Sequence, residues 1–181
     1  MNKIMTAFLA LCAIVLASCS STKVLENDAN DGFRLSQYQT FNFYDIEASG
    51  DTSDMAAYKE GTTALKNAVA KQLIARGLTQ TTANPDLLVN IGIVVKDKVQ
   101  TRETDFRTDA PRYMGQRRYS WKSSEVEVGR YKEGTVTLHL VNRQENKMVW
   151  KGVVSGILPN KPAKLQAQAN DAMTTLFEKV P

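Results

Sequence analysis

Cysteine and histidine are the scarcest reactive residues in this 181-residue chain, which has two cysteines and one histidine. A metal site built from several histidines is therefore excluded, and a histidine-dependent triad would have to use His139. His139 alternates with the apolar Leu138 and Leu140, and no nucleophile motif accompanies it. We expect a surface or cross-strand histidine, no catalytic set, no metal site and no cofactor.

The chain also lacks an apolar run long enough to cross a membrane. Residues 4–16 are apolar except for Thr6, whereas a membrane-spanning helix needs about 20 apolar residues. A basic start at Lys3, this short run and the small residues that follow it are typical of a secretory signal. We expect residues 1–18 to be a signal peptide that is removed.

The run ends in Leu16-Ala17-Ser18-Cys19, which resembles the bacterial lipobox. In such proteins the cysteine thiol is joined to diacylglycerol and the cysteine becomes the first residue of the mature chain. We therefore expect Cys19 to be lipidated and to hold the protein at a membrane, because two or more acyl chains anchor a protein stably. Cys12 leaves with the signal, so the mature domain would contain no disulfide and no cysteine nucleophile.

The residue after Cys19 is Ser20 rather than an aspartate, which in Gram-negative bacteria favours the outer membrane. We expect a lipid-anchored protein of the cell envelope that faces the periplasm or the cell surface. The formal charge of +4 falls to +3 when Lys3 leaves with the signal. A net charge this small, in a protein expected outside the cytoplasm, does not indicate nucleic acid as a partner. The sequence does not indicate an oligomeric state.

Composition predicts one folded unit. Removing residues 1–18 from 181 leaves 163, a length typical of a single domain. The chain has 43% hydrophobic and 23% charged residues, as ordinary globular proteins do. Residues 19–32 are polar and rich in turn-forming residues, and predict a flexible lipid-anchored tether. Residues 33–181 would then form the single domain.

Apolar periodicity predicts the elements of this domain. Strands are expected at residues 38–44, 87–95, 126–128, 136–140 and 148–154, where apolar side chains recur at alternate positions. Leu65, Val69 and Leu73 predict an amphipathic helix that Gly77 terminates, and a second helix is expected after Pro162. The fold class is therefore α+β: a two-layer sandwich with a mainly antiparallel sheet of about 4–5 strands and two amphipathic helices on one face.

Five short blocks, in this order and spacing, resemble the lipoprotein family catalogued as domain of unknown function 4136. They are Ser36-Gln37-Tyr38-Gln39-Thr40-Phe41, Leu73-Ile74-Ala75-Arg76-Gly77-Leu78, Asn84-Pro85-Asp86-Leu87-Leu88-Val89, Tyr131-Lys132-Glu133-Gly134-Thr135-Val136 and Met148-Val149-Trp150-Lys151-Gly152. The resemblance implies an envelope lipoprotein of undetermined activity. Members often carry a glycine- and tyrosine-rich stretch before the fourth block, and here that segment is basic instead.

That basic segment is the candidate partner-binding loop. Its arginines and aromatic residues are Arg112, Tyr113, Arg117, Arg118, Tyr119 and Trp121. Arginine binds phosphate and carboxylate bidentately, and aromatic rings favour an interface between water and apolar matter. We expect an anionic glycolipid or an acidic envelope protein as the partner. The alternative is a solvated loop without a partner.

The carboxylates form no obvious catalytic pair in the sequence. Asp86 is expected to shape the turn into the long strand, and Glu133 to end a loop. The sequence therefore favours a non-enzymatic binding or accessory module. The alternative is a hydrolase that acts on a cell-envelope polymer through Asp or Glu residues that the sequence does not single out. A purely structural lipoprotein is a third hypothesis.

Overall fold

A computed structural model describes residues 22–44, 55–105, 109, 123–159 and 161–181. Its strands are β1 (Lys23–Ala29), β2 (Thr40–Phe43), β3 (Thr79–Gln80), β4 (Leu87–Glu103), β5 (Glu125–Asn142) and β6 (Lys147–Ile157). Its helices are α2 (Met55–Ala75) and α4 (Leu165–Phe177), with short 3-10 turns at Leu35–Gln37 and Pro162–Lys164. The described residues thus form an α+β fold.

The strands form one six-stranded sheet in the order β1-β6-β5-β4-β2-β3, so the expected count of 4–5 strands was too low. Strands β1, β6, β5 and β4 pair antiparallel, while β2 pairs parallel with both β4 and β3. The sheet is therefore mixed. The two-residue β3 was missed because a strand this short carries no periodicity.

The expected tether of residues 19–32 was also wrong in part, because residues 23–29 form β1 on the edge of the sheet. Its apolar residues Val24, Leu25 and Ala29 do not alternate with polar ones, so the sequence gave no strand period. The strand is held by its backbone pairing with β6, by packing of Val24 and Ala29 against the core, and by two polar side-chain contacts. Asn27 Oδ1 accepts a 2.8 Å hydrogen bond from the Trp150 indole, and Lys151 Nζ lies 2.7 Å from Glu26 Oε1.

Strands β4 and β5 are much longer than their apolar segments predicted. The predicted strands 126–128 and 136–140 belong to one strand, β5, which pairs with β4 from Leu87↔Asn142 to Glu103↔Glu125. Glu133 lies within this strand, so its expected role at the end of a loop was wrong. Pairing with a neighbouring strand satisfies the backbone whether or not the side chains are apolar, which is why the pattern underestimated both lengths.

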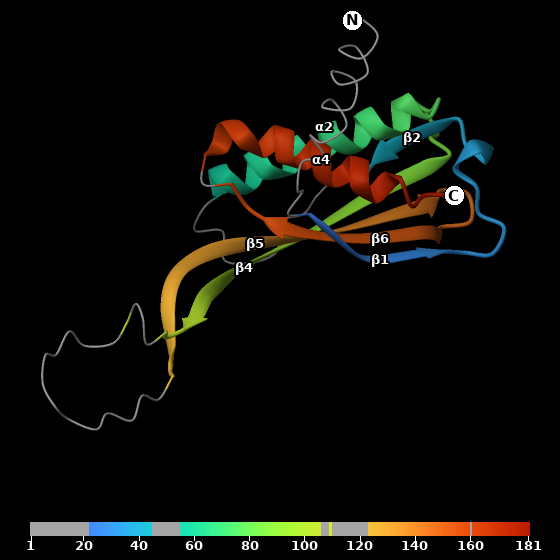
Figure 1. Cartoon of the computed structure of the whole chain (residues 1–181). Coiled ribbons are helices and arrows are strands. Elements are labelled where there is room, and N and C mark those ends of the chain that lie inside the picture. Colours follow the sequence, from blue (N-terminus) through green and yellow to red (C-terminus); the bar gives the residue numbers. More distant parts are fainter. Residues whose placement is uncertain (1–21, 45–54, 106–108, 110–122, 160) are drawn as a thin grey trace, which may run out of the picture.

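Both helices lie on the same side of the sheet, as Figure 1 shows. Their buried residues, among them Val69 and Leu73 of α2 and Met173 and Leu176 of α4, join one core cluster with Leu138 and Trp150 of the sheet. Helix α2 ends as predicted, because Gly77 takes the left-handed conformation at φ 93° that a helix stop requires. Trp150 is fully buried and its ring packs 6.1 Å from that of Phe177.

Gly152 should be intolerant of a side chain. A Cβ at this position would lie 2.8 Å from both Leu176 Cδ1 and Trp150 Cζ2, closer than packed carbon atoms allow. Gly152→Ala should lower the free energy of unfolding by about 1–3 kcal/mol, as overpacking of a filled core does. Urea denaturation followed by circular dichroism measures this. Gly129→Ala is the matched control, because its nearest neighbour, Gln100 Oε1, is 3.9 Å away; equal losses in both variants would refute the packing argument.

Candidate functional site

The predicted functional residues are not among those that the structure describes. Cys19 and the loop residues Arg112, Tyr113, Arg117, Arg118, Tyr119 and Trp121 all lie outside the described residues. The two ends of the loop segment are described. The Thr104 amide donates to the Ser124 carbonyl at 2.9 Å, and the Ser124 amide donates to Thr104 Oγ1 at 2.9 Å. The loop is therefore attached to the far end of the β4–β5 hairpin.

The hairpin continues well past the rest of the sheet. Strand β6 accompanies β5 only as far as Glu133, and β2 accompanies β4 only as far as Val89. Beyond that point residues 97–103 and 125–132 pair as strands with each other, apart from a 2.8 Å hydrogen bond from the Leu158 amide to the Lys132 carbonyl, and we call this two-stranded segment the arm. Figure 1 shows it leaving the body of the domain at one end of the sheet.

The two faces of the arm differ in charge. In an antiparallel pair, directly opposed residues point to the same side of the sheet, so the register assigns each arm residue to the side that the helices cover or to the open side. The helix side carries Asp97, Glu103, Glu125 and Glu127 with Arg130 and Lys132. The open side carries Lys98 and Arg102 with Gln100, Tyr131, Gly129 and Val126. The helix side of the arm is thus net negative and its open side net positive.

Two ion pairs lie on or beside the arm. Arg102 binds Asp109 through two 2.6 Å hydrogen bonds, which raise the pKa of Arg102, and Arg130 binds Glu127 at 2.6 Å, which raises the pKa of Arg130. The Arg130–Glu127 pair is exposed and the Arg102–Asp109 pair is partly exposed, so solvent screens both interactions. They order the surface of the arm and add little to the stability of the fold.

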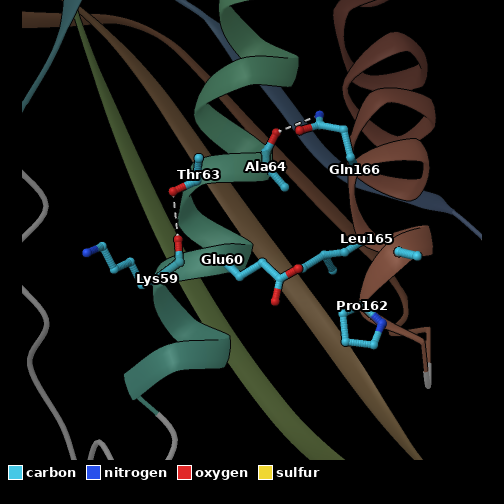
Figure 2. A pocket seen from close by; sticks show the side chains of 8 residues that line it. Lys59, Glu60, Thr63, Ala64, Pro162, Leu165 and Gln166 are labelled. Atoms are coloured by element: carbon cyan, nitrogen blue, oxygen red, sulfur yellow. Dashed lines mark hydrogen bonds between the residues drawn. The ribbon is translucent and has the colours of Figure 1, made fainter.

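A cleft of about 580 Å³ lies between the beginning of α2 and the turn before α4 (Figure 2). Its lining residues are Lys59, Glu60, Thr63, Ala64, Pro162, Ala163, Leu165 and Gln166. Two of its polar side chains form hydrogen bonds with backbone carbonyls of the lining. Thr63 Oγ1 donates to the Lys59 carbonyl, and Gln166 Nε2 donates to the Ala64 carbonyl. Glu60 is the single carboxylate among these lining residues, whereas glycoside hydrolysis uses two.

His139 lies on the open side of the sheet, as its alternation with Leu138 and Leu140 predicted. In the register it faces Asn90 of β4 and Lys151 of β6. Partial burial lowers its pKa, and Lys151 lowers it further, while Glu26 acts in the opposite sense. The surroundings therefore favour the neutral imidazole.

Asp86 joins β2 to the start of β4. One carboxylate oxygen accepts hydrogen bonds of 2.9 Å from the amides of Gln39 and Thr40, and the Asp86 amide donates to Thr40 Oγ1 at 2.9 Å. The bond from Gln39 is the largest cause of the lowered pKa of Asp86. The carboxylate thus organises the turn into the long strand, as the sequence indicated.

Within the described ranges, no three His, Cys, Asp or Glu side chains are grouped so that they could hold a metal ion. Of the helices in those ranges, none combines the length and the apolar character that a membrane crossing requires.

The sequence model of the family described as Domain of unknown function (DUF4136) matches residues 25–181, and the chain belongs to this family. No curated protein matches it. A PDZ domain protein from Parabacteroides distasonis ATCC 8503 is 11% identical with a TM-score of 0.50; the match covers 94% of this chain and 40% of that one. This chain therefore spans less than half of that protein, and the likeness concerns the fold alone.

A second solved structure is less similar. The PelC dodecamer from Paraburkholderia phytofirmans is 10% identical to this chain with a TM-score of 0.46, and the match covers 88% of this chain and 97% of that one. At that score the likeness carries no conclusion about assembly or function.

The role of Asp86 predicts a pH-dependent stability difference. Because its folded pKa lies below the ordinary value of 3.8, its stabilising contribution is full above that value and is lost as the pH falls through the lowered pKa. Asp86→Ala should lower the free energy of unfolding by about 1–2 kcal/mol at neutral pH, as loss of partly exposed charge-assisted hydrogen bonds does. The difference from the wild type should shrink in urea titrations near pH 3. Asp171→Ala, at an exposed carboxylate of α4, is the control, and a pH-independent difference at Asp86 would contradict the assignment.

Proposed function

We propose that the chain is a membrane-anchored lipoprotein of the cell envelope whose domain is a non-enzymatic binding module. The signal layout and the lipobox that ends at Cys19 support the anchor. Outer-membrane attachment, with the domain facing the periplasm or the cell surface, follows from Ser20 by analogy with other lipoproteins. The domain is a two-layer sandwich of helices on one face of the sheet, and this sandwich holds the arm in place.

The extension of the arm beyond the rest of the sheet is the main support for a binding role. A two-stranded hairpin without packing on either face is marginally stable in water, so an extension of this length is expected to serve a contact outside the domain. The segment that contains Arg112, Arg117, Arg118 and Trp121 connects the two strands of the arm in the sequence. Arginines and aromatic rings suit an anionic glycolipid or an acidic envelope protein.

The anchor is tested by replacing the cysteine. Cys19→Ala should abolish incorporation of labelled fatty acid and release the protein from the membrane fraction, because no other residue can carry the diacylglycerol. Cys12→Ala is the matched control and should leave both unchanged, since Cys12 lies within the expected signal. Mass spectrometry of the mature N-terminus identifies the modified residue. Lipid label retained in Cys19→Ala would disprove the anchor.

The binding role is tested by photo-crosslinking in living cells from a probe at Tyr119. One recurrent protein or glycolipid adduct is expected, and the triple change Arg117→Ala, Arg118→Ala, Trp121→Ala should remove it because the charged and aromatic contacts are lost. A probe at Ile74, which is 56% exposed on α2, is the control. Adducts no richer than those from Ile74 would refute the role of the loop. Turnover of peptidoglycan or glycans that one Asp or Glu change abolished would refute the non-enzymatic class.

A further inference from the structure

Strand β5 has a free edge along the arm. From Glu133 onward β6 pairs with this edge, and the Leu158 amide donates a 2.8 Å hydrogen bond to the carbonyl of Lys132. Before Lys132, residues 125–131 pair with β4 on one side and, within the part of the chain that the structure describes, with no strand on the other. Figure 1 shows the arm bending out of the plane of the sheet, so the body of the domain does not cover this edge.

The backbone along this edge is oriented for pairing with a further strand. Because the Lys132 carbonyl binds Leu158, the backbone groups of Lys132 point away from β4. This direction alternates along an antiparallel ladder, so the backbone groups of Arg130, Glu127 and Glu125 also point outward. A strand edge with unpaired amides and carbonyls is a template for another chain, and a two-stranded ribbon gains stability from additional strands.

A register shift gives the charges of this edge a symmetric arrangement about Gly129. The ladder passes from Gly129 to Glu127 between consecutive residues of β4, so Val128 has no opposing residue. Glu127 and Arg130 therefore lie on the same side of the arm although they are three residues apart, and they form the 2.6 Å ion pair. From Gly129 the helix side of the edge is basic in one direction and acidic in the other. The cations are Arg130 and Lys132, and the carboxylates are Glu127 and Glu125.

An edge with this charge pattern is complementary to a second copy of itself. When two β5 edges pair antiparallel about a two-fold axis at Gly129, Arg130 of each copy faces Glu127 of the other. The outward backbone groups of these two residues meet at hydrogen-bonded positions. On the open side Tyr131 of each copy faces Val126 of the other, so a ring packs on an aliphatic side chain.

Other registers of the two β5 edges oppose like charges. An axis at Arg130 would place the two arginines opposite each other, and an axis at Glu127 would do the same with two glutamates. Like charges directly opposed across strands are destabilising. With the axis at Gly129, in contrast, Glu125 lies beside Lys132 of the other copy at the end of the paired segment, so all the charges on this side have unlike neighbours.

The free edge of β4 lacks this property. Gln100 lies directly opposite Gly129 in the arm, so the equivalent pairing of two β4 edges has its axis at Gln100. In that register Asp97 would face Glu103, and Lys98 would face Arg102. Both opposed pairs are of like charge, so self-pairing is favoured at β5 and disfavoured at β4.

We propose that two copies of this chain pair through the free edges of β5 in their arms, about a two-fold axis at Gly129. The joined arms form a four-stranded antiparallel sheet in the order β4-β5-β5-β4, with the two bodies at opposite ends. Val128, which is 48% exposed, lies beside the axis and is covered by the second copy. The inference goes beyond the proposed function, because it concerns the edge of the arm and needs neither the lipid anchor nor the loop.

Disulfide formation at the axis tests this pairing. Gly129 has room for a side chain, since a Cβ there would lie 3.9 Å from its nearest neighbour, Gln100 Oε1. Opposed residues at positions without backbone hydrogen bonds have Cα atoms about 4.5 Å apart, a separation that a disulfide spans. The full chain with Gly129→Cys, expressed with its own signal and oxidised in whole cells with copper phenanthroline, should therefore run as a disulfide-linked dimer on a non-reducing gel.

Gln100→Cys is the matched control, because this position lies on the same side of the arm but on β4. Its counterpart in the second copy would be about 14 Å away, which is three strand spacings and too far for a disulfide. The wild type, with Cys12 and Cys19 as its cysteines, controls for crosslinks through those residues. Both should remain monomeric. No dimer from Gly129→Cys, a dimer from Gln100→Cys, or a mixed disulfide between the two variants at the expense of the Gly129→Cys dimer would overturn the proposal.

Exchange of charges tests the register. Added to Gly129→Cys, either Arg130→Glu or Glu127→Arg alone should lower the yield of dimer about tenfold, because both opposed ion pairs become repulsive. The two single variants, co-expressed with different epitope tags, should recover the dimer as a mixed species, since each opposed pair again has unlike charges. The double variant Glu127→Arg, Arg130→Glu should also recover it.

A head-to-tail pairing of β4 with β5 would give a different result. In the register found within one arm, Arg130 faces Val99 and Glu127 faces Thr101, so neither single change would oppose like charges. Single variants that dimerise as well as the parent, or co-expressed variants that give no mixed dimer, would refute the two-fold pairing. Thermal denaturation of each single variant by circular dichroism should match the parent, because the exposed Arg130–Glu127 pair adds little to the stability of the fold.

Discussion

The antiparallel pairing of β4 with β5 is the constraint on which the rest of the molecule depends. One ladder, with a register shift between Gln100 and Thr101, runs from Leu87↔Asn142 in the core to Glu103↔Glu125 at the far end of the arm. Its first part is apolar on the helix side, and both helices pack against that side of the sheet. Its second part is charged on both faces and extends away from the body. Backbone hydrogen bonds hold both parts of the ladder together. The apolar side chains of the first part belong to the core, and the charged side chains of the second part remain at the surface.

In the core part of the sheet, large side chains pack against positions that carry small ones. Trp150 lies on the helix side of β6 and packs against Phe177 of α4, and Gly152 leaves room for the Trp150 ring and for Leu176. The indole nitrogen would be an unsatisfied donor there, and Asn27 of β1 accepts its hydrogen bond. The edge strand is thereby tied to the largest fully buried side chain among the described residues, which helps to hold a segment without apolar periodicity in the sheet.

The candidate sites lie apart from this core. The cleft at the start of the two helices offers one carboxylate, and His139 and Asp86 are engaged by the sheet and by the β2–β4 junction. The arm, in contrast, combines extension beyond the body, unlike charge on its two faces and attachment of the basic aromatic loop. The proposed role in binding rests on these features of the arm.

The sequence by itself determined the apolar periods of β4, β5 and β6, the helix stop at Gly77, the side of the sheet on which His139 lies and the turn at Asp86, because each depends on neighbours close in the chain. The lipobox and the basic loop are likewise local patterns, and their roles remain predictions. Only the tertiary structure decided that residues 23–29 form an edge strand, that β2 and β3 add a parallel edge, and that β4 and β5 extend into an arm. Those features arise from pairing between segments distant in sequence, and backbone pairing leaves no periodic signature in polar side chains.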